Sequence, residues 1–159
     1  MEIQDFKILQ TERLDLKPVV ASFDFANELF AIISKNRDFY KYIPKVAEAP
    51  NAESEFDFLR RAEKGWKNKT RATYGMYMKS SGAFVGVCSM FHIDWDTESC
   101  EVAAWLNMDY GSQGFVTEAV KTMTQAFLDM GFKRIVIRAN TKNIASRRIA
   151  EKCGFDYFA

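Results

Sequence analysis

The sequence predicts an α/β fold in which helices cover both faces of a mixed β-sheet. Segments with the two-residue period of strands alternate along the chain with segments of helical period. Turns too short for a crossover separate the strands in the middle of the chain, which favours antiparallel hairpins. A complete helix separates two later strands, and a helix in that place joins parallel strands. The order of elements therefore predicts antiparallel hairpins followed by one parallel β-α-β crossover.

The first part of the chain is expected to form one strand and two helices. Residues 12–19 alternate apolar and polar side chains and predict a strand. Residues 22–34 repeat apolar side chains every three to four positions behind a serine cap, which predicts a helix. Residues 41–50 contain two prolines and are expected to form a loop. A second helix follows Asn51, and its apolar stripe contains Phe56, Leu59, Ala62 and Trp66.

The second part of the chain is expected to contain three successive strands, then a helix, a strand and a short helix. The predicted strands span residues 73–79, 83–91, 99–106 and 134–139, and the predicted helices span 116–130 and 144–153. Gly131 and Gly154 follow the two helices and are typical of helix ends. No repeat, low-complexity tract or flexible linker interrupts the pattern. We therefore expect residues 1–159 to form a single domain.

The composition argues against several classes of partner. The 22 basic and 21 acidic residues leave a formal net charge of +1 and form no basic stripe, which argues against nucleic acid. The sequence has no signal-peptide core and no run of about 18 apolar residues, which argues against a membrane. Cys88, Cys100 and Cys153 are odd in number and lack the spacing of metal ligands. We expect reduced core cysteines in a cytoplasmic protein that binds no metal.

Gly111 and Gly114 lie in the turn between strand 99–106 and helix 116–130. The first N–H groups of a helix have no internal partner, and the helix dipole adds positive charge there. Glycine allows a ligand to approach the backbone closely and allows a positive φ. A phosphate or pyrophosphate fits this arrangement. The usual nucleotide motifs do not match, because Phe115 follows Gly114 where a P-loop has lysine. A plain structural turn is the alternative.

Four segments of this sequence resemble the GNAT superfamily of N-acyltransferases, and they occur in the family's order. These segments are TERLDLKP, GAFVGVCSMFHIDW, CEVAAWLNMDYGSQGF and NIASRRIAEKCGF. They are most similar to the branch that acetylates the N-termini of ribosomal proteins, and the resemblance covers nearly the whole chain. It implies a GNAT-type mixed sheet with acetyl-CoA as co-substrate and no metal.

The resemblance also implies which residues bind acetyl-CoA. In the family, the turn Gln/Arg-x-x-Gly-x-Gly/Ala holds the pyrophosphate through backbone amides. The matching residues here are Gly111, Ser112, Gln113, Gly114, Phe115 and Val116. Only Gly114 agrees outright, and a hydroxyl of Ser112 or Thr117 is expected to replace one lost hydrogen bond. The pantetheine arm would pair with the backbone of Trp105, Leu106 and Asn107, and Asn143 and Ser146 would lie near the thioester.

Two residues are implied for the chemistry. Glu101 aligns with a strand glutamate that serves as general base in several family members. The alternative is a strand glutamate paired with a neighbouring lysine or arginine. Ser146 is the candidate acid for the leaving thiolate, because Ala150 stands where many members have a tyrosine. A water, or no specific acid, is the alternative, and Asn143 could equally serve as a helix cap.

The acceptor is expected to be a primary amine that attacks the thioester directly. His92, Tyr40 and Tyr42 are the candidate residues at its entrance. An α-amine is easier to deprotonate at neutral pH than a lysine by roughly 3 kcal/mol, which favours a peptide or ribosomal-protein N-terminus or a small amine of low pKa. The rival hypothesis is a non-catalytic acyl-CoA-binding or interaction protein that keeps the fold.

Family members usually continue beyond the segment EKCGF with further strands. Only four residues follow that segment here. We therefore expect a domain shortened at its C-terminus that lacks the last strands of the sheet. The uncovered edge of strand 134–139 would then be a template for pairing with another chain. A homo-oligomer is one expectation, with a second copy contributing its segment FDYFA or its own edge strand.

Overall fold

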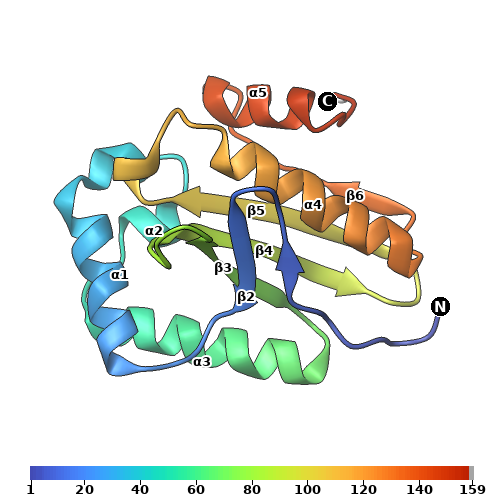
Figure 1. Cartoon of the computed structure of the whole chain (residues 1–159), viewed down its shortest axis with the longest axis horizontal. Coiled ribbons are helices and arrows are strands. Elements are labelled where there is room, and N and C mark those ends of the chain that lie inside the picture. Colours follow the sequence, from blue (N-terminus) through green and yellow to red (C-terminus); the bar gives the residue numbers. More distant parts are fainter. Residues whose placement is uncertain (158–159) are drawn as a thin grey trace.

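A mixed sheet of six strands runs through the protein, whose computed structural model describes residues 1–157 (Figure 1). The strands are β1 (Leu9–Gln10), β2 (Leu14–Pro18), β3 (Ala72–Met78), β4 (Phe84–Asp94), β5 (Ser99–Leu106) and β6 (Arg134–Val136). They lie in this order across the sheet, and every neighbouring pair is antiparallel except β5 and β6, which are parallel. The predicted hairpins followed by one parallel crossover are confirmed.

The helices are α1 (Phe23–Lys35), α2 (Pro44–Ala47), α3 (Ala52–Asn68), α4 (Phe115–Met130) and α5 (Ile144–Lys152), with 3-10 turns η1 (Arg37–Tyr40) and η2 (Met108–Tyr110). The predicted caps are present. Ser22 Oγ accepts from the Phe25 N–H at 3.1 Å, and Asn51 Oδ1 accepts from the Ser54 N–H at 2.9 Å. These bonds satisfy N–H groups that a helix start leaves open.

Several elements differ from the sequence-based expectation, and β4 runs to Asp94, three residues beyond its predicted end. The two-residue strand β1 was not predicted, because it is too short to show a period. The expected loop 41–50 contains α2, which Pro44 starts because its fixed φ suits the first helical position. Strand β6 ends at Val136, whereas the prediction continued it to residue 139.

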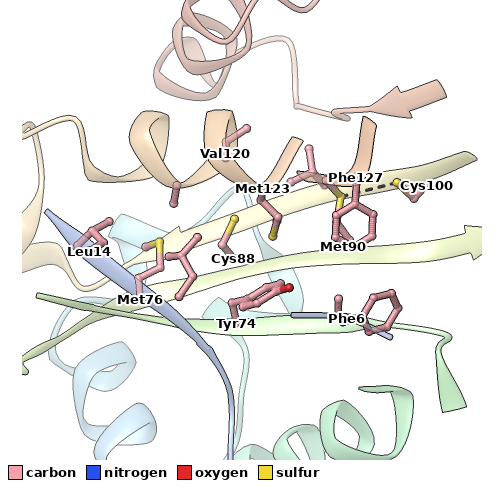
Figure 2. Close-up of a cluster of buried hydrophobic side chains, with 14 of the residues drawn as sticks. Phe6, Leu14, Tyr74, Met76, Cys88, Met90, Cys100, Val120, Met123 and Phe127 are labelled. Carbon is pink, nitrogen blue, oxygen red and sulfur yellow. Dashed lines mark hydrogen bonds between the residues drawn. The ribbon is translucent and has the colours of Figure 1, made fainter. Parts of the chain in front are cut away.

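Two apolar clusters fill the two faces of the sheet. The larger one joins α4 to β2, β3, β4 and β5 (Figure 2). Its buried members include Leu14, Tyr74, Met76, Cys88, Met90, Cys100, Val120, Met123 and Phe127. The second cluster packs α1 and α3 on the opposite face, against Val87 of β4 and Trp105 of β5. Successive strand residues face opposite sides, so helices cover both faces as predicted.

The parallel pairing of β5 with β6 is short. It joins Ser99 to Arg134, Cys100 to Ile135 and Glu101 to Val136. Strand β5 then continues to Leu106 along β4, while the chain after Val136 turns away. The sheet therefore opens between β5 and the segment that follows β6.

All three cysteines are unpaired, as expected. Cys88 and Cys100 are buried, and burial raises the pKa of the Cys100 thiol to about 12. Over residues 1–157, no helix is long and apolar enough to cross a membrane. Of the segment FDYFA, Phe158 and Ala159 lie outside the described residues.

Candidate active site

A cavity of about 860 Å³ lies where β5 and β6 diverge. Its two walls are residues 102–105 of β5 and residues 137–140, which follow β6. On one face of the sheet it is lined by Val116 and Val120 of α4 and by Asn143, Ser146 and Ile149. On the other face it is lined by Val87, Ser89 and Phe91 of β4 and by residues of α2 and α3. One opening therefore connects both faces, so that two molecules can meet at the divergence.

The start of α4 borders the first half of this cavity and has no side-chain cap. By contrast, α1, α3 and α5 begin with side-chain caps. The first helical bond of α4 runs from the Glu118 N–H to the Gly114 carbonyl at 3.0 Å. The N–H groups of the three residues before Glu118 thus remain available to bind an anion.

The turn before α4 has the positive φ angles that an open backbone cradle needs. Gly114 has φ +80 and Ser112 has φ +60, whereas Gly111 has φ −65. The positive φ predicted for the glycines of this turn is confirmed at Gly114, and the prediction is wrong for Gly111. A serine in this region of φ is uncommon and carries strain.

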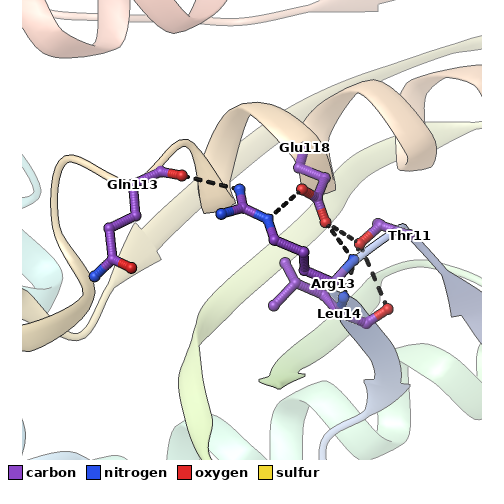
Figure 3. Close-up of polar contacts among 5 residues, drawn as sticks. All are labelled: Thr11, Arg13, Leu14, Gln113 and Glu118. Atoms are coloured by element: carbon purple, nitrogen blue, oxygen red, sulfur yellow. Dashed lines mark hydrogen bonds and ion pairs between the residues drawn. The ribbon is translucent and has the colours of Figure 1, made fainter. Parts of the chain in front are cut away.

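An arginine and a glutamate hold this turn against β2 (Figure 3). Arg13 Nε donates to Glu118 Oε1 at 2.8 Å, and Arg13 Nη2 donates to the Gln113 carbonyl at 2.9 Å. The Glu118 carboxylate also accepts from the Arg13 N–H and the Thr11 hydroxyl. The guanidinium lies 4.2 Å from the centre of the Phe115 ring. We call Thr11, Arg13, Gln113 and Glu118 the turn clamp.

The clamp neutralises the one carboxylate in the first turn of α4. Burial of Glu118 opposes its ionisation, but the hydrogen bonds from Thr11 and Arg13 outweigh burial and lower its pKa. A negative charge at a helix start would otherwise compete with a bound anion. Sequence analysis did not find this role, although the segment TERLDLKP contains Thr11 and Arg13.

The end of β5 is fixed by a side chain of η1 and by a backbone hydrogen bond of Asn107, the residue before η2. The Tyr40 hydroxyl donates to the Leu106 carbonyl at 2.9 Å, and the Asn107 N–H donates to the Val85 carbonyl at 2.7 Å. Trp105 is buried against Tyr40 and also lines the cavity. Tyr40 was expected at the acceptor entrance, but it is 2% exposed and supports the strand instead. Tyr42 does line the cavity.

Glu101 lies at the last paired position of β5 and β6 and binds two basic side chains. Its Oε1 accepts from Arg138 Nε at 2.9 Å and lies 3.2 Å from His92 Nδ1. Burial opposes ionisation of Glu101, but these two partners outweigh it and lower its pKa. Within residues 1–157, the cavity lining includes Arg138 and Ala103 but neither Glu101 nor His92. Pairing with a neighbouring arginine, the alternative from the sequence, is therefore present.

Asn143 and Ser146 come together at the start of α5, as the sequence suggested. Asn143 Oδ1 accepts from the Ser146 N–H at 3.2 Å and caps the helix. Both residues line the cavity. The cap leaves the Ser146 side chain at the wall, so the capping and ligand roles are compatible.

Three charged residues on the other face of the sheet were not found from the sequence. Glu55 and Arg61 of α3 and Arg71 beside β3 line the same cavity. They come from segments remote from the turn before α4, so no local motif marks them. In the described part of the chain, no group of three or more potential ligands could hold a metal ion.

Comparisons with known proteins identify the family and the fold of this chain. The family model described as an acetyltransferase (GNAT) domain matches residues 13–156. A protein of Bacillus subtilis, named "Probable N-acetyltransferase YjcK", is 23% identical over 134 residues, which cover 82% of this chain and 74% of the relative.

Two solved structures share the fold over most of their length. The microcin C7 self-immunity acetyltransferase MccE, in complex with acetyl-CoA and AMP, matches with a TM-score of 0.80 and 25% identity, covering 90% of this chain and 78% of that one. The ribosomal L7/L12 acetyltransferase RimL, in complex with coenzyme A, matches with a TM-score of 0.84 and 17% identity, covering 96% and 86%.

Proposed function

This chain belongs to the GNAT acetyltransferase family, and on that premise we propose that it transfers the acetyl group of acetyl-CoA to a primary amine within the cavity. The observation that carries the proposal is the opening between β5 and β6, which joins both faces of the sheet beside the uncapped start of α4. Such an opening admits an acyl donor from one face and an acceptor from the other.

Acetyl-CoA would bind on the face of α4 and α5. Its pyrophosphate would sit on the N–H groups at the start of α4, in the turn Gly111–Thr117 that includes Ser112, Gln113, Phe115 and Val116. Its pantetheine arm would run along the edge of β5 near Trp105, Leu106 and Asn107, which has no β6 partner beyond Glu101 among the described residues. Since the Leu106 carbonyl and the Asn107 N–H are already bonded to Tyr40 and Val85, the arm would use the remaining backbone groups of this segment. The thioester would then reach the divergence near Asn143 and Ser146.

The reaction is a direct transfer. The amine gives up a proton and its nitrogen attacks the thioester carbonyl, the C–S bond breaks, and the thiolate takes a proton. We assign proton removal to Glu101 acting through a water that it orders, because its side chain does not line the cavity, and protonation of the thiolate to Ser146. A backbone N–H near Leu106 would stabilise the oxyanion. The cysteines take no part, because Cys100 points into the core, where its Sγ donates to Met90 Sδ.

The proposed acceptor is an amine that loses its proton easily. Glu101 is held by two basic partners and is therefore a weak base. An α-amine suits such a base better than lysine does, by roughly 3 kcal/mol of deprotonation cost. A peptide or ribosomal-protein N-terminus, or a small amine of low pKa, meets this condition. Tyr42 at the cavity wall is the remaining aromatic candidate for contact with it. Three unpaired cysteines fit the reducing cytoplasm, where we place the reaction.

Thiol release from acetyl-CoA, measured with a panel of peptide and small amines, tests the proposal. We expect release that depends on the amine and follows its neutral fraction. The rival function is binding of acyl-CoA without turnover. Calorimetry that shows acetyl-CoA binding, together with no thiol release for any amine, would favour that rival.

A further inference from the structure

The acceptor half of the cavity contains a largely buried glutamate whose carboxylate has no protein partner among the described residues. Glu55, in the first turn of α3, is 6% exposed and lines the cavity. No hydrogen bond or ion pair to its carboxylate is present among residues 1–157. The positive charge of Arg37 favours the ionised form of Glu55, but burial has the larger effect on its pKa, and the Arg37 guanidinium donates to the Ala47 carbonyl at 2.7 Å. Burial raises the pKa of Glu55. A buried carboxylate without a donor is costly, and a ligand cation would relieve that cost.

Two arginines in the same half of the cavity lack a counter-ion. Arg61 is exposed and Arg71 is half-buried; both line the cavity, and no carboxylate within the described chain pairs with either. Burial, and then repulsion by Arg61, lowers the pKa of Arg71. Arg71 lies 5.8 Å from the centre of the Phe91 ring, so it is held at the wall. Two close guanidinium groups suit a carboxylate or phosphate, which each binds with paired hydrogen bonds.

The carboxylate of Glu55 and the two guanidinium groups occupy different parts of the cavity wall. Glu55 and Arg61 are six residues apart on α3, which corresponds to about 9 Å along the helix axis. The other charged residues of the lining do not alter this pattern. Lys45 and Glu48 are exposed at the rim, and Arg138 is bound to Glu101. A ligand that satisfies both groups therefore needs two charges separated by several bonds.

We propose that the acceptor carries both a primary amine and an anionic group, with the amine bound at Glu55 and the carboxylate or phosphate bound by Arg61 and Arg71. This inference rests on the proposed function, because it assigns the acceptor of that reaction. An acidic peptide N-terminus and an aminoalkyl phosphate share this chemistry.

Calorimetry in the presence of coenzyme A tests the assignment without requiring turnover. The phosphate arm compares 3-aminopropyl phosphate with 3-aminopropanol, and the peptide arm compares glycyl-glutamate amide with glycyl-glutamine amide. We expect the charged member to bind about 10-fold more tightly in at least one arm. The double variant Arg61→Gln/Arg71→Gln should remove this preference. Arg60→Gln is the matched control, since Arg60 lies on the same helix outside the lining.

A second pair of ligands tests whether Glu55 binds the amine of the acceptor. Glu55→Gln should weaken binding of 3-aminopropyl phosphate about 10-fold and leave 3-hydroxypropyl phosphate unchanged. Glu53→Gln, an exposed position of the same helix turn, is the control. Equal binding within both arms, a preference that survives the double arginine variant, or equal effects of Glu55→Gln on both phosphates would overturn the inference.

The two proposals fail in different ways. Selective binding of the charged acceptor without thiol release contradicts the proposed function and supports this site. Thiol release with no preference for the charged acceptor contradicts this site alone.

Discussion

Arg13→Gln tests how the turn before α4 is held. The guanidinium donates to Glu118 Oε1 at 2.8 Å and to the Gln113 carbonyl at 2.9 Å, and it covers the Phe115 ring at 4.2 Å. Because the Arg13 side chain is 40% exposed, its ion pair contributes only about 0.5 kcal/mol. The carbonyl hydrogen bond contributes about 1 kcal/mol, and the ring contact about 0.5 kcal/mol. The free energy of unfolding should therefore fall by about 2 kcal/mol.

The same substitution should weaken acetyl-CoA binding. It leaves the Glu118 charge less compensated in the first turn of α4, which costs an anion there roughly 0.3–1 kcal/mol. It also frees the Gln113 carbonyl, so the turn must be ordered on binding at a similar cost. Together these effects amount to about 1.4 kcal/mol, or a tenfold rise in Kd.

A double-mutant cycle separates the two contributions. Calorimetry would compare the wild type, Arg13→Gln, Glu118→Gln and the double variant, with thermal unfolding as the control for folding. Glu118→Gln alone should bind acetyl-CoA about as well as the wild type, because its amide oxygen still accepts from the Thr11 hydroxyl and the Arg13 N–H, and the loss of the Arg13 Nε bond is offset by removal of a negative charge at the helix start. The double variant should recover about threefold of the tenfold loss. Wild-type affinity in folded Arg13→Gln, or no recovery in the double variant, would refute the clamp's role.

Four further results are expected. Gly114→Val should abolish measurable acetyl-CoA binding, because Gly114 has φ +80 and a side chain there blocks the backbone cradle; unchanged affinity in a folded variant would place the pyrophosphate elsewhere. Glu101→Gln should cut turnover about 100-fold with little change in acetyl-CoA affinity, and activity that survives would leave Glu101 only its pairing with Arg138. The lowered pKa of Glu118 means that its contribution to stability is complete above the ordinary glutamate pKa and is lost as the pH falls through the folded-state pKa; unfolding of Glu118→Gln should be less sensitive to pH in that range. Self-association along the edge of β6 stays a prediction, which light scattering at micromolar concentration tests and a stable monomer would contradict.

The sequence predicted those elements whose signals are local. Strand β5 has the predicted bounds, and α1, α3 and α5 begin at the side-chain caps that the sequence indicates. The proposed cofactor half of the cavity could be predicted for the same reason, since the turn, the end of β5 and the start of α5 are short contiguous segments. The length of β6 could not be predicted, because it depends on where β5 and the chain after Val136 separate. The turn clamp could not be predicted either, since Arg13 and Glu118 are 105 residues apart in sequence.

Glu55 shows why the acceptor half escaped sequence analysis. The predicted apolar stripe of α3 contained Leu59 and Ala62, and the structure buries both. Glu55 lies four residues before Leu59, at the spacing that continues this stripe by one turn. An analysis of hydrophobic pattern rejects a carboxylate at that position, although the helix geometry places it there. Proteins break the hydrophobic pattern of a helix mainly at functional sites. A charged residue at a buried position of that pattern is therefore a candidate for a functional role. Because Glu55 is buried without an ion-pair partner, this conflict is the reason that we propose Glu55, and no residue of a sequence motif, as the amine site.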